Sequence, residues 1–323
     1  MQTHELIIPQ QGRLDKMLSL KLHQSRNQIE KLIREGLVEV AGKVITKPSY
    51  RLSAGDTVHC TFREAKKQKR IDFDFDIDVL YEDEDLLVIN KPSGLVVHPA
   101  PSVKEATLVD WLIHRGVSLS TISGEERHGI VHRIDKETTG ALVVAKNNKT
   151  HQALSAQLQD KSMGRYYLAL IDVPLKQNIK VEKPIFRNPH NRLKMAIVDG
   201  GRESKTEFVR IAEGINGTAL IAAKLYTGRT HQIRVHLESL GRHILGDELY
   251  GYKGKKGKVH RVYLHAYLLY LVHPSTSERV EIAAPIFSDM RAYMEKNFNK
   301  GEIDAKIQED RFFNCFMDTE HTA

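Results

Sequence analysis

A single carboxylate, Asp135, stands in a polar turn immediately ahead of an apolar run. His132 and Arg133 precede it, and the polar residues 138–140 separate it from the five apolar residues 141–145. A short apolar run bounded by turn residues is typical of a strand covered on both faces, and loops held by such strands commonly carry reactive groups. Asp135 is therefore placed to do chemistry. The alternative is an aspartate that only accepts backbone hydrogen bonds in a β-turn.

A second segment, residues 228–241, combines basic side chains with a helical pattern. Thr230 is suited to cap a helix that ends near Gly241, and the apolar positions Ile233, Leu237 and Leu240 share one helical face. Arg234 lies next to that face, so its side chain could point inward. His231 and His236 lack the HExxH spacing of a zinc site, so we expect no metal here.

A third segment, residues 165–170, reads as a strand that carries two adjacent tyrosines. Tyr166 and Tyr167 must face opposite sides of such a strand, because successive side chains alternate. Arg165 precedes them. Taken singly, a strand tyrosine most often belongs to the core with its hydroxyl satisfied.

The N-terminal segment predicts a compact module of two helices followed by short strands. Apolar residues at 14, 17 and 18 form one helical stripe. Ser25 and Gln28 form a capping box for a second helix that Gly36 closes. Three basic residues fall off the buried stripe of the second helix: Arg26, Lys31 and Arg34. With about 60 residues, the module is near the lower limit for independent folding.

The positive charge of the chain is concentrated in this segment. Residues 1–70 hold 14 Lys and Arg against seven Asp and Glu, whereas the remaining residues hold 34 of each, so the net charge of +7 lies entirely in the first fifth of the 323 residues. Such asymmetry favours a polyanionic partner, because Lys and Arg neutralise phosphates. A solvated basic face that keeps the protein soluble is the alternative.

Composition limits the remaining possibilities. Two distant cysteines, Cys60 and Cys315, support neither a disulfide framework nor a zinc site with four protein ligands. The chain begins without the layout of a signal peptide, and no apolar run approaches the roughly 18 residues of a membrane span. We expect a cytoplasmic protein, neither secreted nor inserted in a membrane.

These segments together resemble the RluA family of RNA pseudouridine synthases. Residues 132–140 are similar to the family's His-Arg-Leu-Asp-x-x-Thr-Ser-Gly motif, with Ile134 and Thr139 as departures. Residues 90–94 resemble its N-K-P-x-G motif, and residues 228–237 match its Gly-Arg-Thr-His-Gln-Ile-Arg-Val-His-Leu motif. Residues 96–99, VVHP, look most like RluD-type members. His243 stands where the family usually has proline, which we expect to loosen a turn.

The resemblance implies roles for individual residues. Asp135 would be the catalytic carboxylate, acting either at C1′ as a nucleophile or at C2′ as a base. Arg234 would pair with it and keep it charged, and Tyr167 would stack on the base. Further RNA contacts are expected from His132, Arg133 and Arg229 of these motifs. Arg165 is expected to add another, because it precedes Tyr167 in a segment that resembles the family's Lys/Arg-x-Tyr-x-Ala. Lys91 and His98 could be substrate contacts, but we interpret them as parts of a turn framework. The family uses neither a cofactor nor a metal.

The N-terminal module resembles an S4 RNA-binding domain, in which Arg13, Arg26, Lys31 and Arg34 would meet RNA. The fold implied is α+β, a mixed, mainly antiparallel sheet with a central cleft plus the S4-like domain. We predict an S4-like domain over residues 1–62, a basic linker over 63–70, a catalytic domain over 71–300 and a loosely docked tail over 301–323. Residues 252–261 should form an exposed loop.

The expected activity is the isomerisation of uridine to pseudouridine in a stem-loop of large-subunit ribosomal RNA, by a monomer. Transfer RNA as the substrate is one alternative. A ribosome-assembly factor that carries an S4 domain and has no catalytic activity is the other.

Overall fold

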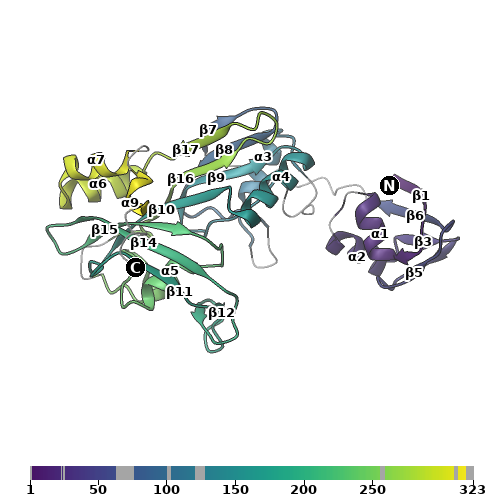
Figure 1. Ribbon diagram of the computed structural model, residues 1–323, viewed down its shortest axis with the longest axis horizontal. Coiled ribbons are helices and arrows are strands. Elements are labelled where there is room, and N and C mark those ends of the chain that lie inside the picture. The colour runs from purple at the N-terminus through teal and green to yellow at the C-terminus, as the bar shows by residue number, and fades with distance from the viewer. Residues whose placement is uncertain are drawn as a thin grey trace. The chain divides into compact units, whose positions relative to one another are not determined.

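The computed structural model describes residues 2–22, 24, 26–62, 76–99, 103–120, 128–254, 259–308 and 312–317. Its contacts divide the chain into two compact units (Figure 1). One comprises Met1–Asp74, His98–Ile130 and Ala145–His151, and the other comprises Phe75–Val97, Val131–Val144 and Gln152–Ala323. The predicted linker, residues 63–70, and the capping residue Ser25 lie outside the described residues. No helix among the described residues is long and apolar enough to cross a membrane.

The N-terminal module contains a four-stranded sheet in the order β1-β6-β3-β4 and two helices. The predicted first helix is confirmed as α1, Leu14–Lys21, and the second as α2, Arg26–Arg34. Both bury apolar side chains with the sheet in one core around Leu14, Ile33 and Val58. The strands are β1 (Gln2–Ile7), β2 (Gly12–Arg13), β3 (Val38–Val40), β4 (Lys43–Val44), β5 (Arg51–Leu52) and β6 (Thr57–Phe62).

The second unit is built on a nine-stranded sheet in the order β11-β14-β15-β10-β16-β9-β8-β7, with β17 paired to β16. Strands β16 and β9 are parallel, whereas β10 pairs antiparallel with both β15 and β16. The α+β fold with a mixed, mainly antiparallel sheet is therefore confirmed. The strands are β7 (Asp78–Glu82), β8 (Leu86–Lys91), β9 (Thr139–Ala145), β10 (Gly164–Ile171), β11 (Ile179–Glu182), β14 (Lys205–Glu213), β15 (Ala219–Leu225), β16 (Leu264–Val272) and β17 (Arg279–Ala283).

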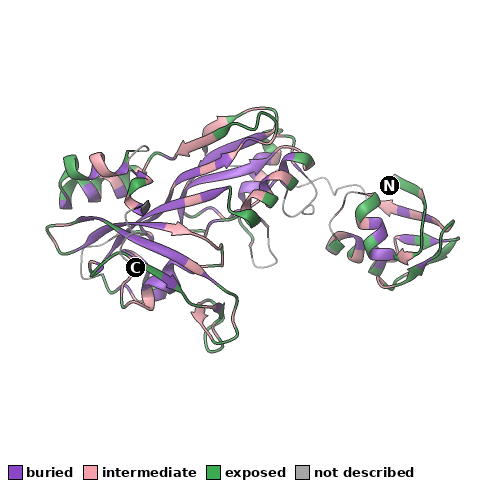
Figure 2. Cartoon of the chain, in the orientation of Figure 1, coloured by how far each residue is buried: buried purple, intermediate pink, exposed green. Residues whose placement is uncertain are grey.

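The strand in the middle of this sheet, β9, is buried. All seven residues of β9 are buried (Figure 2), which confirms the strand predicted from the apolar run. Gly140 has φ of +111°, and a Cβ there would lie 2.3 Å from the carbonyl oxygen of Ala266 on β16. Beside it, the Thr139 hydroxyl lies 2.9 Å from Nδ1 of His265, whose Nε2 lies 3.1 Å from the Ala284 carbonyl oxygen. These contacts fix the start of β9, and with it the end of the loop that carries Asp135.

The remaining elements are short. A small hairpin joins β12 (Ile185–Arg187) to β13 (Met195–Ile197). The helices are α3 (Leu108–His114), α4 (Asn148–Asp160), α5 (Gln232–Glu238), α6 (Ser288–Asn297), α7 (Lys300–Ile307) and α9 (Asn314–Met317), with one 3-10 turn, η2 (Glu248–Tyr250).

The prediction of a loosely docked tail is wrong for the residues after 300 that the structure describes. Ile303, Ile307, Phe312 and Phe316 are buried in one apolar cluster with residues of β10, β14 and β16. The rings of Phe312 and Phe316 lie 5.7 and 4.9 Å from the Tyr166 ring, centroid to centroid. The segment showed no helical period because its aromatic residues pack from short, separate turns.

Candidate active site

The turn at residues 90–94 holds the loop that carries Asp135 through hydrogen bonds. The Lys91 side chain is fully buried, and its Nζ donates to the carbonyl oxygens of Pro92, Leu95 and Lys136 at 2.7, 2.8 and 3.0 Å. The Gly94 N–H also donates to the Lys136 carbonyl, at 2.9 Å. Burial lowers the pKa of Lys91 to about 7. Lys91 thus belongs to the turn framework, and that framework holds the residue next to Asp135.

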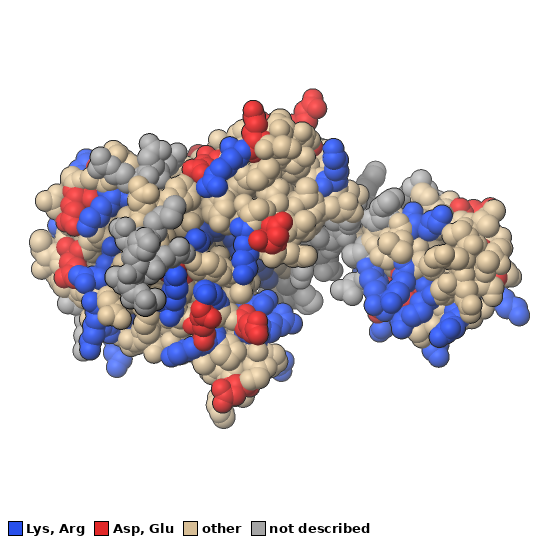
Figure 3. Space-filling view, in the orientation of Figure 1, with Lys and Arg blue, Asp and Glu red and all other residues tan. Residues whose placement is uncertain are grey.

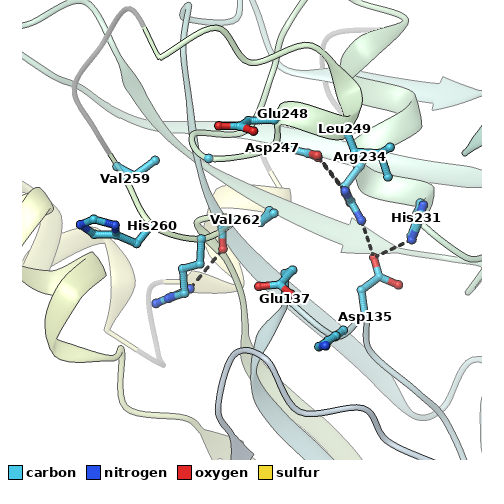
Figure 4. A pocket seen from close by; sticks show the side chains of 13 residues that line it. Asp135, Glu137, His231, Arg234, Asp247, Glu248, Leu249, Val259, His260 and Val262 are labelled. Carbon is cyan, nitrogen blue, oxygen red and sulfur yellow. Dashed lines mark hydrogen bonds and ion pairs between the residues drawn. The ribbon is translucent and has the colours of Figure 1, made fainter. Parts of the chain in front are cut away.

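The Asp135 carboxylate faces two nitrogen groups without a close contact to either. Its Oδ2 lies 3.5 Å from Nη1 of Arg234 and 4.0 Å from Nε2 of His231 (Figure 4). Its side chain is 17% exposed. Within the described residues, no hydrogen bond reaches this carboxylate. The Asp135 carboxylate therefore lies beside the Arg234 guanidinium without accepting a hydrogen bond from it.

Arg234 is held by partners other than Asp135. Its Nε and Nη2 donate to the two carboxylate oxygens of Asp247, each at 2.7 Å, and its guanidinium carbon lies 4.7 Å from the centre of the Tyr250 ring. Burial alone would lower the Arg234 pKa, but the hydrogen bonds to Asp247 outweigh it and raise that pKa. The bidentate pair leaves Nη1 aimed at Asp135.

His231 is oriented by Tyr250. Its Nδ1 lies 2.8 Å from the Tyr250 hydroxyl, which also accepts the Met195 N–H at 2.8 Å. A hydroxyl that already accepts can donate its own proton to Nδ1, which leaves an Nε2–H facing Asp135. Burial lowers the pKa of His231, so at neutral pH the ring is a neutral donor.

The start of α5 differs from the prediction. The residue before the helix is His231, with a left-handed φ of +56°, and α5 begins at Gln232, so Thr230 does not cap it. The Gln232 side chain instead ties the preceding loop to the helix, because its Oε1 accepts the Arg229 N–H at 3.0 Å. The inward position of Arg234 is confirmed, since its side chain is only 7% exposed.

Tyr167 shares a small cavity with Asp135. This cavity, of about 60 Å³, is also lined by Arg165 and Leu264. Tyr166 packs in the aromatic cluster on the other face of β10, and the pairing of β10 with β16 shifts register between the two tyrosines. Such bulges re-aim side chains beside functional sites. Burial raises the pKa of Tyr167, so its hydroxyl is protonated at neutral pH.

The other predicted contacts divide into two groups. Arg133, Arg165 and Arg229 line the small cavity, Arg133 being exposed. His132 is buried, accepts the Val143 N–H at 3.3 Å, and has a pKa that burial lowers. Its position supports the loop and argues against direct contact with RNA.

All four N-terminal basic residues predicted to meet RNA are exposed. Two of them, Arg13 and Arg26, also bind the buried carboxylate of Asp15, and Arg34 pairs with Glu30 at 3.2 Å. Lys and Arg side chains gather over α1 and α2 (Figure 3). Asp15 was not singled out from the sequence, although its place between two arginines in the helix–helix contact is what fixes their direction.

His236 and His243 have structural partners. The His236 ring lies 2.9 Å from the Thr206 hydroxyl and 3.1 Å from the Lys183 carbonyl oxygen. No metal-binding cluster occurs among the residues that the structure describes. The expectation that His243 loosens a turn is wrong: its N–H and its ring both bind the Asp172 carboxylate, each at 2.8 Å. A proline could make neither contact.

Sequence reasoning passed over Asp247 and Tyr250, the two residues that orient Arg234 and His231. Both lie in the segment 246–251, a few residues after His243. Gly246 is required there, because a Cβ would lie 1.9 Å from the Arg261 carbonyl oxygen. The sequence signal that could have indicated Asp247 is its position directly after Gly246, because a glycine permits close approach of two chain segments.

Comparison with known proteins agrees with this geometry. Residues 85–239 match the RNA pseudouridylate synthase family and residues 12–58 match the S4 domain. The chain is 47% identical to an uncharacterized RNA pseudouridine synthase of Helicobacter pylori strain J99, over 94% of this chain and 96% of the relative. The chain belongs to the RNA pseudouridine synthases. It is therefore an isomerase that acts on RNA.

Two further comparisons agree with this family assignment. This pseudouridine synthase is 38% identical to the ribosomal large subunit pseudouridine synthase D of Zymomonas mobilis, over 86% of this chain and 92% of the relative. Its fold is similar to that of human RNA pseudouridylate synthase domain containing 1, with a TM-score of 0.54 and 27% identity over 65% of this chain and 84% of that one.

Proposed function

We propose that this pseudouridine synthase acts on a uridine in a stem-loop of large-subunit ribosomal RNA, with Asp135 as its catalytic carboxylate. Two relatives that are 38% and 37% identical carry the name ribosomal large subunit pseudouridine synthase D, which supports this substrate. One observation carries the catalytic assignment. The Asp135 carboxylate accepts no hydrogen bond from the described residues, and it lies 3.5 Å from a guanidinium that another carboxylate holds in place.

The reaction needs an ionised carboxylate next to the ribose. The N1–C1′ bond breaks, the uracil turns and C5 joins C1′, after which C5 loses its proton and N1 gains one by way of solvent or a nearby base. Asp135 acts either as the nucleophile at C1′, with an ester that breaks when C5 joins C1′, or as the base that removes a C2′ proton and later returns it. In both cases the Arg234 guanidinium lies beside the carboxylate and attracts its negative charge. The product is an isomer of the substrate, so the balance of atoms and electrons requires no cofactor.

Tyr167 and the basic residues of the small cavity receive the base. A cavity of about 60 Å³ is smaller than a uracil, so exposed side chains such as Arg133 must move when the base enters. Leaving the stack costs a few kcal/mol, which favours a loop over a duplex. Tyr167 then stacks on the uracil and can relay the C5 proton.

The N-terminal module, which we place at residues 1–62, adds affinity through phosphates without reading bases. We propose that a single chain is sufficient for activity, because Asp135, Tyr167, Arg234 and Asp247 all come from one copy. Activity on the RNA of ribosomes would place the enzyme in the cytoplasm.

The test is pseudouridine mapping of ribosomal RNA from cells that lack this protein, after rescue with wild type, Asp135→Asn or Asp199→Asn. Asp199 is an exposed carboxylate outside both cavities and serves as the matched control. Sites that are restored by wild type and the control but not by Asp135→Asn support the proposal. Unchanged large-subunit RNA would move the substrate to transfer RNA, and rescue by Asp135→Asn would remove the catalytic assignment and favour an assembly factor.

A further inference from the structure

A second and larger cavity adjoins Asp135 and takes no part in the chemistry described above. It measures about 450 Å³ and lies between the segments 246–249 and 259–262, a volume in the usual range for small-ligand sites. Asp135, His231 and Arg234 line both cavities, whereas Tyr167 lines only the small one. A nucleotide in the larger cavity would therefore be a neighbour of a uridine held between Asp135 and Tyr167.

The lining of this cavity suits a nucleobase. Leu249, Val259 and Val262 supply apolar surface, and His260 presents an exposed ring at the edge that Figure 4 shows opposite Asp135. RNA-binding proteins hold splayed bases by stacking on such rings and by hydrogen bonds to the base edges.

Four carboxylates line this cavity, and among the described residues only that of Glu248 has neither a hydrogen bond nor an ion pair. Asp135 faces Arg234 at 3.5 Å. Asp247 is bound by Arg234, and Glu137 accepts a hydrogen bond from Ser93 at 3.2 Å. Glu248 is exposed, and among the described residues no side chain or backbone group binds its carboxylate. An unpaired carboxylate repels phosphate, so on a surface that binds RNA its favourable partners are the N–H groups of a base edge.

We propose that the larger cavity binds a guanosine adjacent to the target uridine and that Glu248 determines this preference. Guanine presents two parallel donors, N1–H and the 2-amino group, and these match the two oxygens of a carboxylate. Adenine, cytosine and uracil each present a single donor position on that edge, so they form one charge-assisted hydrogen bond where guanine forms two.

The inference rests on the proposed function and is tested on the RNA fragment that wild type modifies. Each nucleotide next to the target uridine is replaced by the other bases and, where it is guanosine, by inosine, which lacks the 2-amino group. Rates are measured for wild type, for Glu248→Gln and for Glu213→Gln, an exposed carboxylate outside both cavities. Glutamine keeps one acceptor and gains a donor, which suits adenine better than guanine.

The expected result is a loss of about tenfold in kcat/KM when one neighbouring guanosine becomes inosine or adenosine. Glu248→Gln should lose this preference and Glu213→Gln should keep it. An adjacent guanosine that is absent, or that wild type does not need, overturns the inference. So does an unchanged preference in Glu248→Gln. Each of those results leaves pseudouridine formation intact, whereas the absence of pseudouridine in any RNA would overturn the proposed function itself.

Discussion

Two aspartates of this enzyme, Asp15 and Asp135, each face positively charged arginine, yet their surroundings differ completely. Asp15 is fully buried and accepts hydrogen bonds from Arg13, Arg26 and the Lys16 N–H, all between 2.6 and 3.1 Å. Asp135 is partly exposed, and its nearest cation stands 3.5 Å away. The first carboxylate is saturated with donors and therefore holds structure. The second keeps its lone pairs available.

The difference comes from how each arginine is occupied. Arg13 and Arg26 direct their hydrogen bonds at Asp15 itself. Arg234 gives its two short bonds to Asp247 and offers only Nη1 to Asp135. Asp247 thus holds the guanidinium near Asp135 without a close contact between the two, which is the preorganisation that the proposed catalytic role of Asp135 needs.

Asp135→Asn is expected to have the largest effect, a loss of activity with little change in stability. Turnover in vitro should fall by roughly 10⁴-fold, as when an enzyme loses its nucleophile, because an amide can neither attack C1′ nor take the C2′ proton. The midpoint of thermal unfolding should change by less than about 2 °C. Single-turnover assays and calorimetry measure the two. Retention of more than a tenth of the activity would place the reactive group elsewhere.

The reverse outcome is expected for Asp15→Asn. Charge-assisted hydrogen bonds from two half-exposed guanidinium groups would be weakened, which should destabilise the N-terminal module by about 2 kcal/mol. The rate at saturating RNA should stay within about threefold of wild type. Hydrogen exchange of residues 2–62 in the full chain measures the first effect. Unaltered exchange would show that Asp15 does not hold the module together.

Asp247→Asn should make the surroundings of Asp135 more like those of Asp15, with an arginine bound directly to the carboxylate. Without its bidentate acceptor, Arg234 is free to move onto Asp135, so we expect kcat to fall by roughly 10- to 100-fold while KM for RNA changes little. The matched variant is Asp172→Asn, which removes a carboxylate bound by His243 outside both cavities. Equal losses in the two variants would mean that the effect is general destabilisation.

The smallest effect is an acid dependence confined to the N-terminal module. Burial alone would raise the pKa of Asp15, but its hydrogen bonds from Arg13 and Arg26 outweigh burial and lower that pKa to about 2 from an ordinary 3.8. Its stabilising contribution is therefore complete above about pH 4 and is lost as pH falls toward 2. Hydrogen exchange of residues 2–62 should show this loss in wild type and a weaker one in Asp15→Asn. If protection falls equally with pH in wild type and in Asp15→Asn, groups other than Asp15 cause the acid sensitivity.

The parts of this site that could be predicted are those that a local pattern specifies. The apolar run 141–145 gave a buried strand, and Arg234 beside an apolar helical face gave an inward guanidinium. Asp247 could not be predicted to bind Arg234, because the two meet through a turn whose path depends on close contact between Gly246 and Arg261. The shift in register at Tyr167 depends in the same way on a partner strand distant in sequence.

The burial of the C-terminal residues also could not be predicted from a local sequence pattern. Phe312 and Phe316 lie in turns too short to show a helical period, yet they complete the core behind β10. Their burial is a property of the surface they meet, and that surface is formed by three other strands. A local pattern cannot report it.

The strand order of the large sheet also determines when the enzyme can become active during synthesis. Strands β7, β8 and β9 lie on one side of β16, and β10, β15, β14 and β11 lie on the other, so β16 alone joins the half that leads to Asp135 with the half that bears Tyr167. Thr139 is made 125 residues before Leu264, which is on the order of ten seconds of translation. A nascent chain therefore holds Asp135 and Tyr167 well before β16 completes the sheet, whereas Arg234 is made only 30 residues before Leu264.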